Sequence, residues 1–161
     1  MVAPPTKRIG ELLLERRLIT QRQLDDALLQ QRTTKAFLGE ILVSVGAITP
    51  EALLEALSEH FHIPRESLDP QRIDWTVTKP FPASILLSGR CFPIRADATS
   101  VTVAIVNPLD AGALSEIERL VGVRRIKPVL VMARDLQAVV QAYKHQTLRA
   151  IQERLAGHGH Q

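Results

Sequence analysis

The chain has 161 residues, of which 45% are hydrophobic and 23% charged, and its formal net charge at pH 7 is +3. This length and composition allow a buried core, so they exclude a disordered chain and indicate one domain or two small ones. Aromatic residues make up only 4% of the chain and the positive charge is thinly spread, so we expect no nucleic-acid partner.

The cysteine content and the hydropathy of the chain indicate a cytoplasmic location. Cys91 is the only cysteine, so no internal disulfide forms, and its apolar neighbours predict a buried thiol rather than a reactive one. No apolar run has the length of a transmembrane helix, and the first residues lack the apolar segment of a signal peptide. We therefore expect a cytoplasmic protein without membrane insertion.

Residues 8–31 recur in a looser form as residues 37–60. An offset of 29 residues, without gaps, gives eight identities in 24 positions, which indicates an internal repeat. Each copy predicts a short helix, a turn and a longer helix. Thr20 and Gln23 form a capping-box pattern at the start of the first longer helix, and Thr49 with Pro50 begins its counterpart. Gly46 is expected to end the short helix of the second copy.

The second half of the chain alternates strand and helix patterns. Residues 62–82 contain four prolines and predict a connector with at most short helices, which Trp75 anchors on a domain. A hairpin and a third strand follow, and Asp110 begins an intervening helix that Gly122 ends. The order predicts a small three-stranded sheet with helices on one face, and hence an α+β fold.

These elements predict four segments along the chain. They are a helical subdomain of two tandem helix-turn-helix motifs at residues 1–63, a connector at 64–82, an α+β subdomain at 83–146 and a C-terminal helical tail at 147–161.

The repeat also contains polar and glycine positions that packing alone explains less well. Gln31 follows Leu24 and Leu28 at i+7 and i+3, so the three share one helix face, and His60 has the same place in the second copy. Most of the leucines are expected to lie in the core. A glycine at the same place in both copies, Gly10 and Gly39, indicates close approach of a neighbouring helix or of a ligand.

The repeat resembles the tandem 24-residue motif of the MshEN family, including its five-residue spacer, residues 32–36. This family is the N-terminal domain of type II secretion and type IV pilus ATPases, and it also occurs elsewhere as a receptor for cyclic di-GMP. In the second copy, Phe37 stands where the family often has a basic residue, and His60 stands where it usually has glutamine. The resemblance implies that cyclic di-GMP binds at Arg8, Ile9, Gly10, Leu13, Leu24, Leu28, Gln31, Phe37, Leu38, Gly39, Leu42, Leu53, Leu57 and His60.

The chemistry of cyclic di-GMP agrees with these residue types. An arginine such as Arg8 can donate two parallel hydrogen bonds to guanine O6 and N7 or stack on the base. The Gln31 amide can donate and accept at a base edge, while the leucines form an apolar floor and the glycines leave room for the ligand. His60 and His62 lack a third ligand, so we expect no metal site.

The sequence contains neither a GxxxxGK[ST] phosphate-binding loop nor a recognisable catalytic constellation, so we expect no enzyme and no cofactor. The expected function is a receptor or adaptor that relays the cyclic di-GMP level to a partner protein of a secretion, pilus or regulatory machine. The alternative is a docking module of such a machine that binds no nucleotide.

Overall fold

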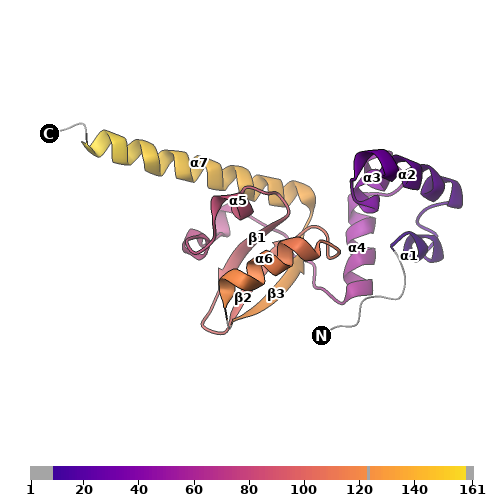
Figure 1. The fold of residues 1–161 in the computed structure, drawn as a ribbon, viewed down its shortest axis with the longest axis horizontal. Helices are drawn as coiled ribbons and strands as arrows, with labels where there is room; N and C mark the ends of the chain where they lie inside the picture. Colours follow the sequence, from indigo (N-terminus) through magenta and orange to yellow (C-terminus); the bar gives the residue numbers. More distant parts are fainter. Residues whose placement is uncertain (1–8, 123, 159–161) are drawn as a thin grey trace. The chain divides into compact units, whose positions relative to one another are not determined.

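The computed structural model describes residues 9–122 and 124–158 of the chain. It divides into two compact units, Met1–Ile63 (unit 1) and Pro64–Gln161 (unit 2). In Figure 1 the described part of unit 1 consists of helices, whereas unit 2 combines strands and helices. The fold class is therefore α+β, which confirms the prediction from the sequence.

Unit 1 repeats one pattern of a short and a longer helix. Its helices are α1 (Ile9–Glu15), α2 (Gln21–Thr34), α3 (Leu38–Ser44) and α4 (Pro50–Phe61). The predicted caps are confirmed, because the Thr20 side chain accepts a hydrogen bond from the Gln23 amide and the Gln23 side chain accepts one from the Thr20 amide. The Thr49 side chain accepts a bond from the Ala52 amide in the same way. These bonds satisfy amides that a helix start otherwise leaves without a partner.

The turn between the two helices has the same backbone bonds in both copies. The Leu18 amide donates to the Leu13 carbonyl, and the Ala47 amide donates to the Leu42 carbonyl. Both turns need a left-handed residue, which is Gly46 (φ 77°) in the second copy and Arg17 (φ 58°) in the first. Left-handed backbone is strained for a residue with a Cβ atom, and glycine adopts it freely.

Because the first turn contains the strained residue, Arg17→Gly should stabilise the protein by about 0.5–1 kcal/mol. The reverse comparison, Gly46→Ala, should destabilise it by about 1 kcal/mol for the same reason. Urea unfolding followed by far-UV circular dichroism measures both changes. A loss of stability in the Arg17→Gly variant would contradict the proposed strain.

The core of unit 1 is aliphatic and joins both copies of the repeat. It contains the buried residues Leu13, Ile19, Leu24, Ala27, Leu38, Ile41, Leu42, Ile48 and Ala56. Neither copy, a short helix and a longer one, could bury its apolar face alone, so the two copies share one core.

Unit 2 is built around a three-stranded sheet. Its helical elements are the 3₁₀ turns η1 (Pro70–Arg72) and η2 (Trp75–Thr78) and the helices α5 (Ala83–Leu86), α6 (Ala111–Val121) and α7 (Ala133–His158). The strands are β1 (Cys91–Ala96), β2 (Ser100–Ile105) and β3 (Arg125–Leu130), in the order β1-β2-β3. β1 pairs antiparallel with β2, and β3 pairs parallel with β2 after the α6 crossover. The predicted hairpin and third strand are therefore confirmed.

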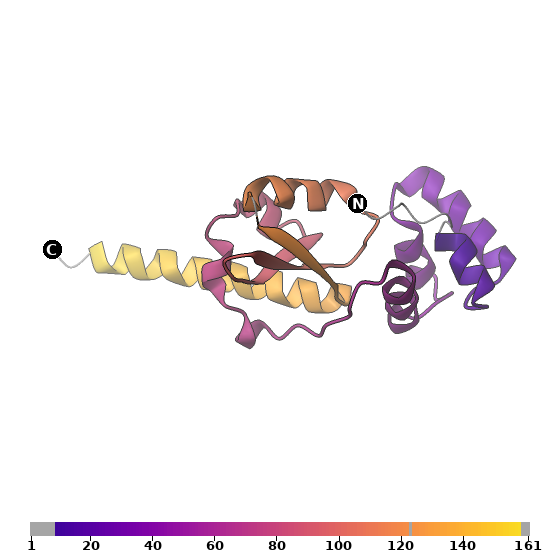
Figure 2. The same cartoon turned by 90° about the horizontal axis from the view of Figure 1, so that it is seen from below.

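Helices cover both faces of this sheet, so the prediction of helices on one face was wrong. Figure 2 shows α6 and α7 on opposite sides of the strands. All six residues of the central strand β2 are buried, which requires cover on both faces because successive side chains point in opposite directions. Trp75 packs against Phe92 of β1 and Tyr143 of α7, which confirms its predicted role as an anchor.

Hydrogen bonds attach the start of unit 2 to the edge of the sheet. The Leu130 amide donates to the Pro64 carbonyl, and the Glu66 amide donates to the Leu130 carbonyl. Arg95 of β1 also forms two hydrogen bonds with the Glu66 carboxylate, which hold the pKa of Glu66 below its ordinary value. Residues 64–66 are therefore integrated into the sheet edge.

The long helix α7 packs on unit 2 only along its first half. Leu136, Val139 and Val140 are buried and Tyr143 is half-buried, whereas every residue from 144 to 157 is exposed. None of the described helices is long and apolar enough to cross a membrane.

Candidate functional site

The space beside each of the two repeated glycines is occupied by a leucine of the longer helix in the same copy of the repeat. A Cβ atom added at Gly10 would lie 2.8 Å from Cδ1 of Leu24, and one added at Gly39 would lie 3.0 Å from Cδ2 of Leu53. Contacts this short require one of the atoms to move. Each glycine therefore allows the longer helix to pack closely against the shorter one, which was one of the two explanations that the sequence left open.

Most of the predicted leucine positions lie in the core. Leu13, Leu24, Leu38, Leu42 and Leu57 are buried, and Ile9 and Leu53 are half-buried. Leu13 and Leu42 have no exposed surface at all. Their side chains pack the two helical pairs together, and this packing fixes the positions of the helices that would carry any site on unit 1.

Among the predicted positions that the structure describes, Leu28 and Phe37 remain open to solvent. Leu28 on α2 is 41% exposed, and Phe37, the residue that precedes α3, is 38% exposed. Gln31 lies one helical turn after Leu28, so the two share a face of α2. The Gln31 side-chain amide donates a 3.2 Å hydrogen bond to the Ala36 carbonyl. We call Leu28, Gln31, Ala36 and Phe37 the α2–α3 corner.

The α2–α3 corner therefore combines two exposed apolar side chains with an amide held beside the peptide bond that joins Ala36 to Phe37. Phe37 makes no side-chain capping bond at the start of α3. Contiguous exposed apolar surface marks a site of interaction, and a few fixed polar groups orient what binds there. The Ala36 carbonyl belongs to the spacer, and no sequence motif indicated that it would orient Gln31.

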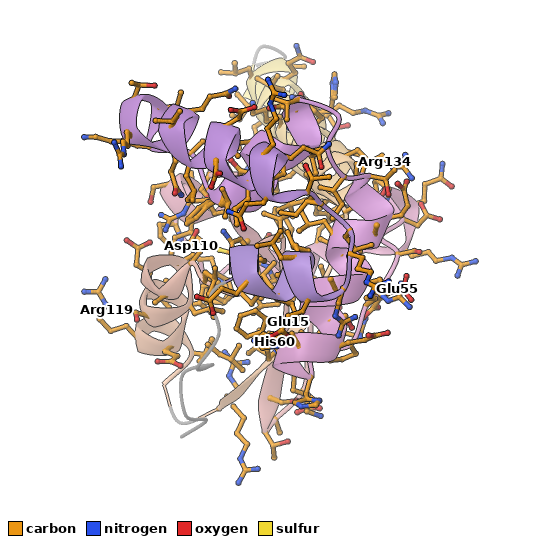
Figure 3. All side chains as sticks on the ribbon, turned by 90° about the vertical axis from the view of Figure 1, so that its right-hand side faces the viewer. Glu15, Glu55, His60, Asp110, Arg119 and Arg134 are labelled. Atoms are coloured by element: carbon orange, nitrogen blue, oxygen red, sulfur yellow. The ribbon has the colours of Figure 1, made fainter. Side chains whose placement is uncertain are left out.

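His60 lies near the end of α4 with one ring nitrogen lacking a partner. Its Nε2 atom is buried and has no hydrogen bond within the described residues. Its ring packs edge-on against the Phe61 ring, with 5.0 Å between the ring centroids. Arg16 at the end of α1 forms an ion pair with Glu59 of α4. Figure 3 shows the labelled side chains of Glu15 and His60 at these same two helix ends. A buried nitrogen without a bond is costly, so a ligand that bonds it would be favoured.

Arg8, the remaining predicted contact, lies outside the described residues. Within the described part, the structure brings Gln31 to the residue before Phe37, and it places His60 at the junction of α1 and α4.

Unit 2 contains a polar cluster that serves its own packing. Arg90 forms two hydrogen bonds with Asp110, which is 8% exposed and also accepts a bond from the Ala113 amide at the start of α6. The guanidinium holds the pKa of Asp110 below its ordinary value. The predicted cap by Asp110 is confirmed, whereas Arg90, 20 residues away, could not be predicted as its partner.

Burial raises the pKa of the neighbouring Cys91 thiol to about 11, so this thiol is protonated and unreactive at neutral pH.

The described residues show no convergence of potential metal ligands. No group of three or more His, Cys, Asp or Glu side chains within residues 9–122 and 124–158 is arranged to hold a metal ion.

Comparison with known proteins identifies the family. The profile of the MshEN domain matches residues 61–150, which is more than half of the chain. The chain belongs to the MshEN family. The match covers most of unit 2 and begins only after the tandem motif, residues 8–60. The profile and the motif are therefore separate lines of support for the same family.

Two curated relatives of this MshEN chain are much longer proteins. Bacteriophage adsorption protein B of Escherichia coli K12 is 32% identical over 124 residues, which are 77% of this chain and 16% of that protein. Type IV pilus assembly ATPase PilB of Thermus thermophilus is 33% identical over 118 residues, which are 72% of this chain and 13% of that protein. The chain thus spans less than a fifth of the length of either relative.

A solved structure of MshE with cdg, an abbreviation of cyclic di-GMP, has the same fold as the MshEN chain described here. The TM-score is 0.72 at 24% identity, and the match covers 85% of this chain and 99% of that chain. Because unit 2 begins only at Pro64, a match of this extent includes part of unit 1.

Proposed function

We propose that the chain is a cyclic di-GMP receptor domain that binds its ligand on unit 1 and relays the bound state to a partner protein, without catalysis of its own. The observation that carries this proposal is the α2–α3 corner, where the tandem motif leaves Leu28 and Phe37 exposed beside the held amide of Gln31. Membership of the MshEN family supports the same function.

Four side chains would hold the nucleotide. Leu28 supplies exposed apolar surface for a base or ribose, and the Gln31 amide, which has two N–H donors and one carbonyl acceptor, bonds a base edge. Arg8 donates to the acceptor edge of a guanine. His60 offers to a second part of the ligand its Nε2 atom, which has no hydrogen bond within residues 9–122 and 124–158. The buried leucines and the two glycines then act by fixing the helices that carry these groups.

The covalent path for a relay is short. At the end of α4 the Ile63 amide donates to the Ser58 carbonyl, and the Ser58 hydroxyl donates to the Ile63 carbonyl. The next residue, Pro64, already accepts a hydrogen bond from Leu130 of β3. Four residues of chain separate His60 from Pro64, and along them a displacement of α4 caused by ligand contact at His60 would be passed to unit 2. Ligand binding that favours one arrangement of α4 would shift the population of states seen by a partner.

Titration calorimetry of the whole chain with cyclic di-GMP tests the binding claim. We expect saturable heat, and the absence of heat at tens of micromolar ligand would contradict the proposal. Failure of every nucleotide to raise the melting temperature, together with retained capture of a secretion or pilus protein, would favour the docking module instead.

Gln31→Ala should weaken cyclic di-GMP binding by about 1–3 kcal/mol, the usual loss for hydrogen bonds to a base edge, and Arg8→Ala should do the same. Gln30→Ala is the matched control, because Gln30 is an exposed glutamine at the preceding position of α2. Calorimetry on the three variants measures the effect. Equal affinities in the Gln31→Ala and Gln30→Ala variants would place the ligand elsewhere.

A further inference from the structure

The two copies of the motif present different chemistry at equivalent positions. With the offset of 29 residues, Phe37 corresponds to Arg8 and His60 corresponds to Gln31. A ligand with two identical bases would therefore meet two unequal sets of side chains. The consequence for base selectivity depends on what surrounds Phe37.

The surroundings of Phe37 are visible at the α2–α3 corner. Phe37 is 38% exposed, and its backbone is extended, with φ −68° and ψ 144°. The hydrogen bond from Gln31 to the Ala36 carbonyl places the glutamine amide at the peptide bond just before the ring. The group that could bond a base, the Gln31 amide, is thus held at Ala36, the residue next to the ring that could stack on it.

A phenyl ring and a glutamine amide do not distinguish the two purines. Stacking on an aromatic ring tolerates any base, because every base has a π-face. One N–H of Gln31 is used by Ala36, and the amide keeps a second N–H and a carbonyl oxygen. This pair bonds N7 and the N6 amino group of adenine, and it equally bonds O6 and N1–H of guanine.

An arginine at position 37 would discriminate, because a guanidinium only donates. It pairs with the two acceptors N7 and O6 of guanine, and it meets an amino donor on adenine. Loss of such a bidentate pair removes discrimination of about 5- to 150-fold between the bases. The phenyl ring of Phe37 has neither donor nor charge.

We propose that the α2–α3 corner binds either purine by stacking on Phe37, so that the chain binds a mixed cyclic dinucleotide of guanine and adenine about as well as cyclic di-GMP. This inference rests on the proposed function and adds the ligand class that the corner accepts. It assigns Phe37 as the residue that determines base selectivity.

Calorimetric titration of the whole chain with cyclic di-GMP and with 3′,3′-cyclic GMP–AMP tests the inference. We expect dissociation constants within tenfold of each other for the wild-type chain. Phe37→Arg should raise the ratio of the two dissociation constants to tenfold or more in favour of cyclic di-GMP. Val45→Arg is the matched control, because it places the same charge on an exposed apolar position after the other end of α3, and its ratio should equal that of the wild type.

The outcomes separate this inference from the proposed function. No heat with cyclic di-GMP would overturn the proposed function itself. Binding of cyclic di-GMP with tenfold or greater preference over the mixed nucleotide in the wild type would overturn the inference alone. An unchanged ratio in Phe37→Arg, in a variant whose circular dichroism spectrum is native, would overturn the role of Phe37.

Discussion

Replacing Leu42 with alanine is expected to lower the free energy of unfolding of unit 1 by about 2–5 kcal/mol. Leu42 on α3 is completely buried and belongs to the core shared by both copies of the repeat. The substitution removes buried methyl groups and leaves a cavity that surrounding helices fill only in part. For a small aliphatic core this is a large fraction of the total stability.

The two aromatic reporters of the chain allow this loss to be assigned to a unit. Trp75 and Tyr143, the single tryptophan and tyrosine, both belong to unit 2, so fluorescence follows that unit, whereas circular dichroism follows the helices of both. Urea unfolding of Leu42→Ala should show the shift in the dichroism signal. Leu29→Ala is the control, because Leu29 is an exposed leucine of the same unit. Equal shifts in the two variants would mean that Leu42 is not part of a packed core.

Replacing Gly10 with valine is expected to destabilise unit 1 by about 1–3 kcal/mol, the usual cost of inserting methyl groups into a filled space. The space beside Gly10 is occupied by the methyl groups of Leu24, and a Cδ atom of Leu38 lies 3.3 Å from the same point. Because this interior is already packed, the new side chain must displace Leu24 or separate the helices.

A double-mutant cycle tests whether Leu24 is the obstacle. Leu24→Ala alone should be destabilising because it opens a cavity, and the combination of Gly10→Val with Leu24→Ala should be more stable than the sum of the single changes predicts. Urea unfolding of the four proteins gives the coupling energy. Additivity of the two changes would show that the glycine serves something other than this helix contact, such as direct approach of the ligand.

The elements that could be predicted from the sequence are those set by neighbours along the chain. The cap at Thr20 depends on Gln23 three residues later, and the glycine turn at Gly46 depends on backbone conformation alone. Such patterns appear in the sequence at fixed spacing. The three strands could be predicted for the same reason, since their apolar runs are bounded by turn residues.

Contacts between distant residues could not be predicted in this way. The sheet has helices on both faces because β2 is buried throughout, and its apolar run is compatible with burial on one face or on two. The orientation of Gln31 by the Ala36 carbonyl and the pairing of Arg90 with Asp110 are likewise three-dimensional outcomes. The repeat indicated where the candidate site residues lie, but which of them are exposed depends on how the two helical pairs pack.

The exposed half of α7 has a thermodynamic consequence of its own. Residues 144–157 would extend for about 20 Å at 1.5 Å per residue. An isolated helix of this length is only marginally stable in water, because nucleation is costly and each added residue gains little. The packed turns up to Tyr143 supply the nucleus, so helicity propagates outward from them and amide protection should fall along the segment. The length of α7 should therefore change with temperature and with its surroundings, while the rest of the fold stays the same.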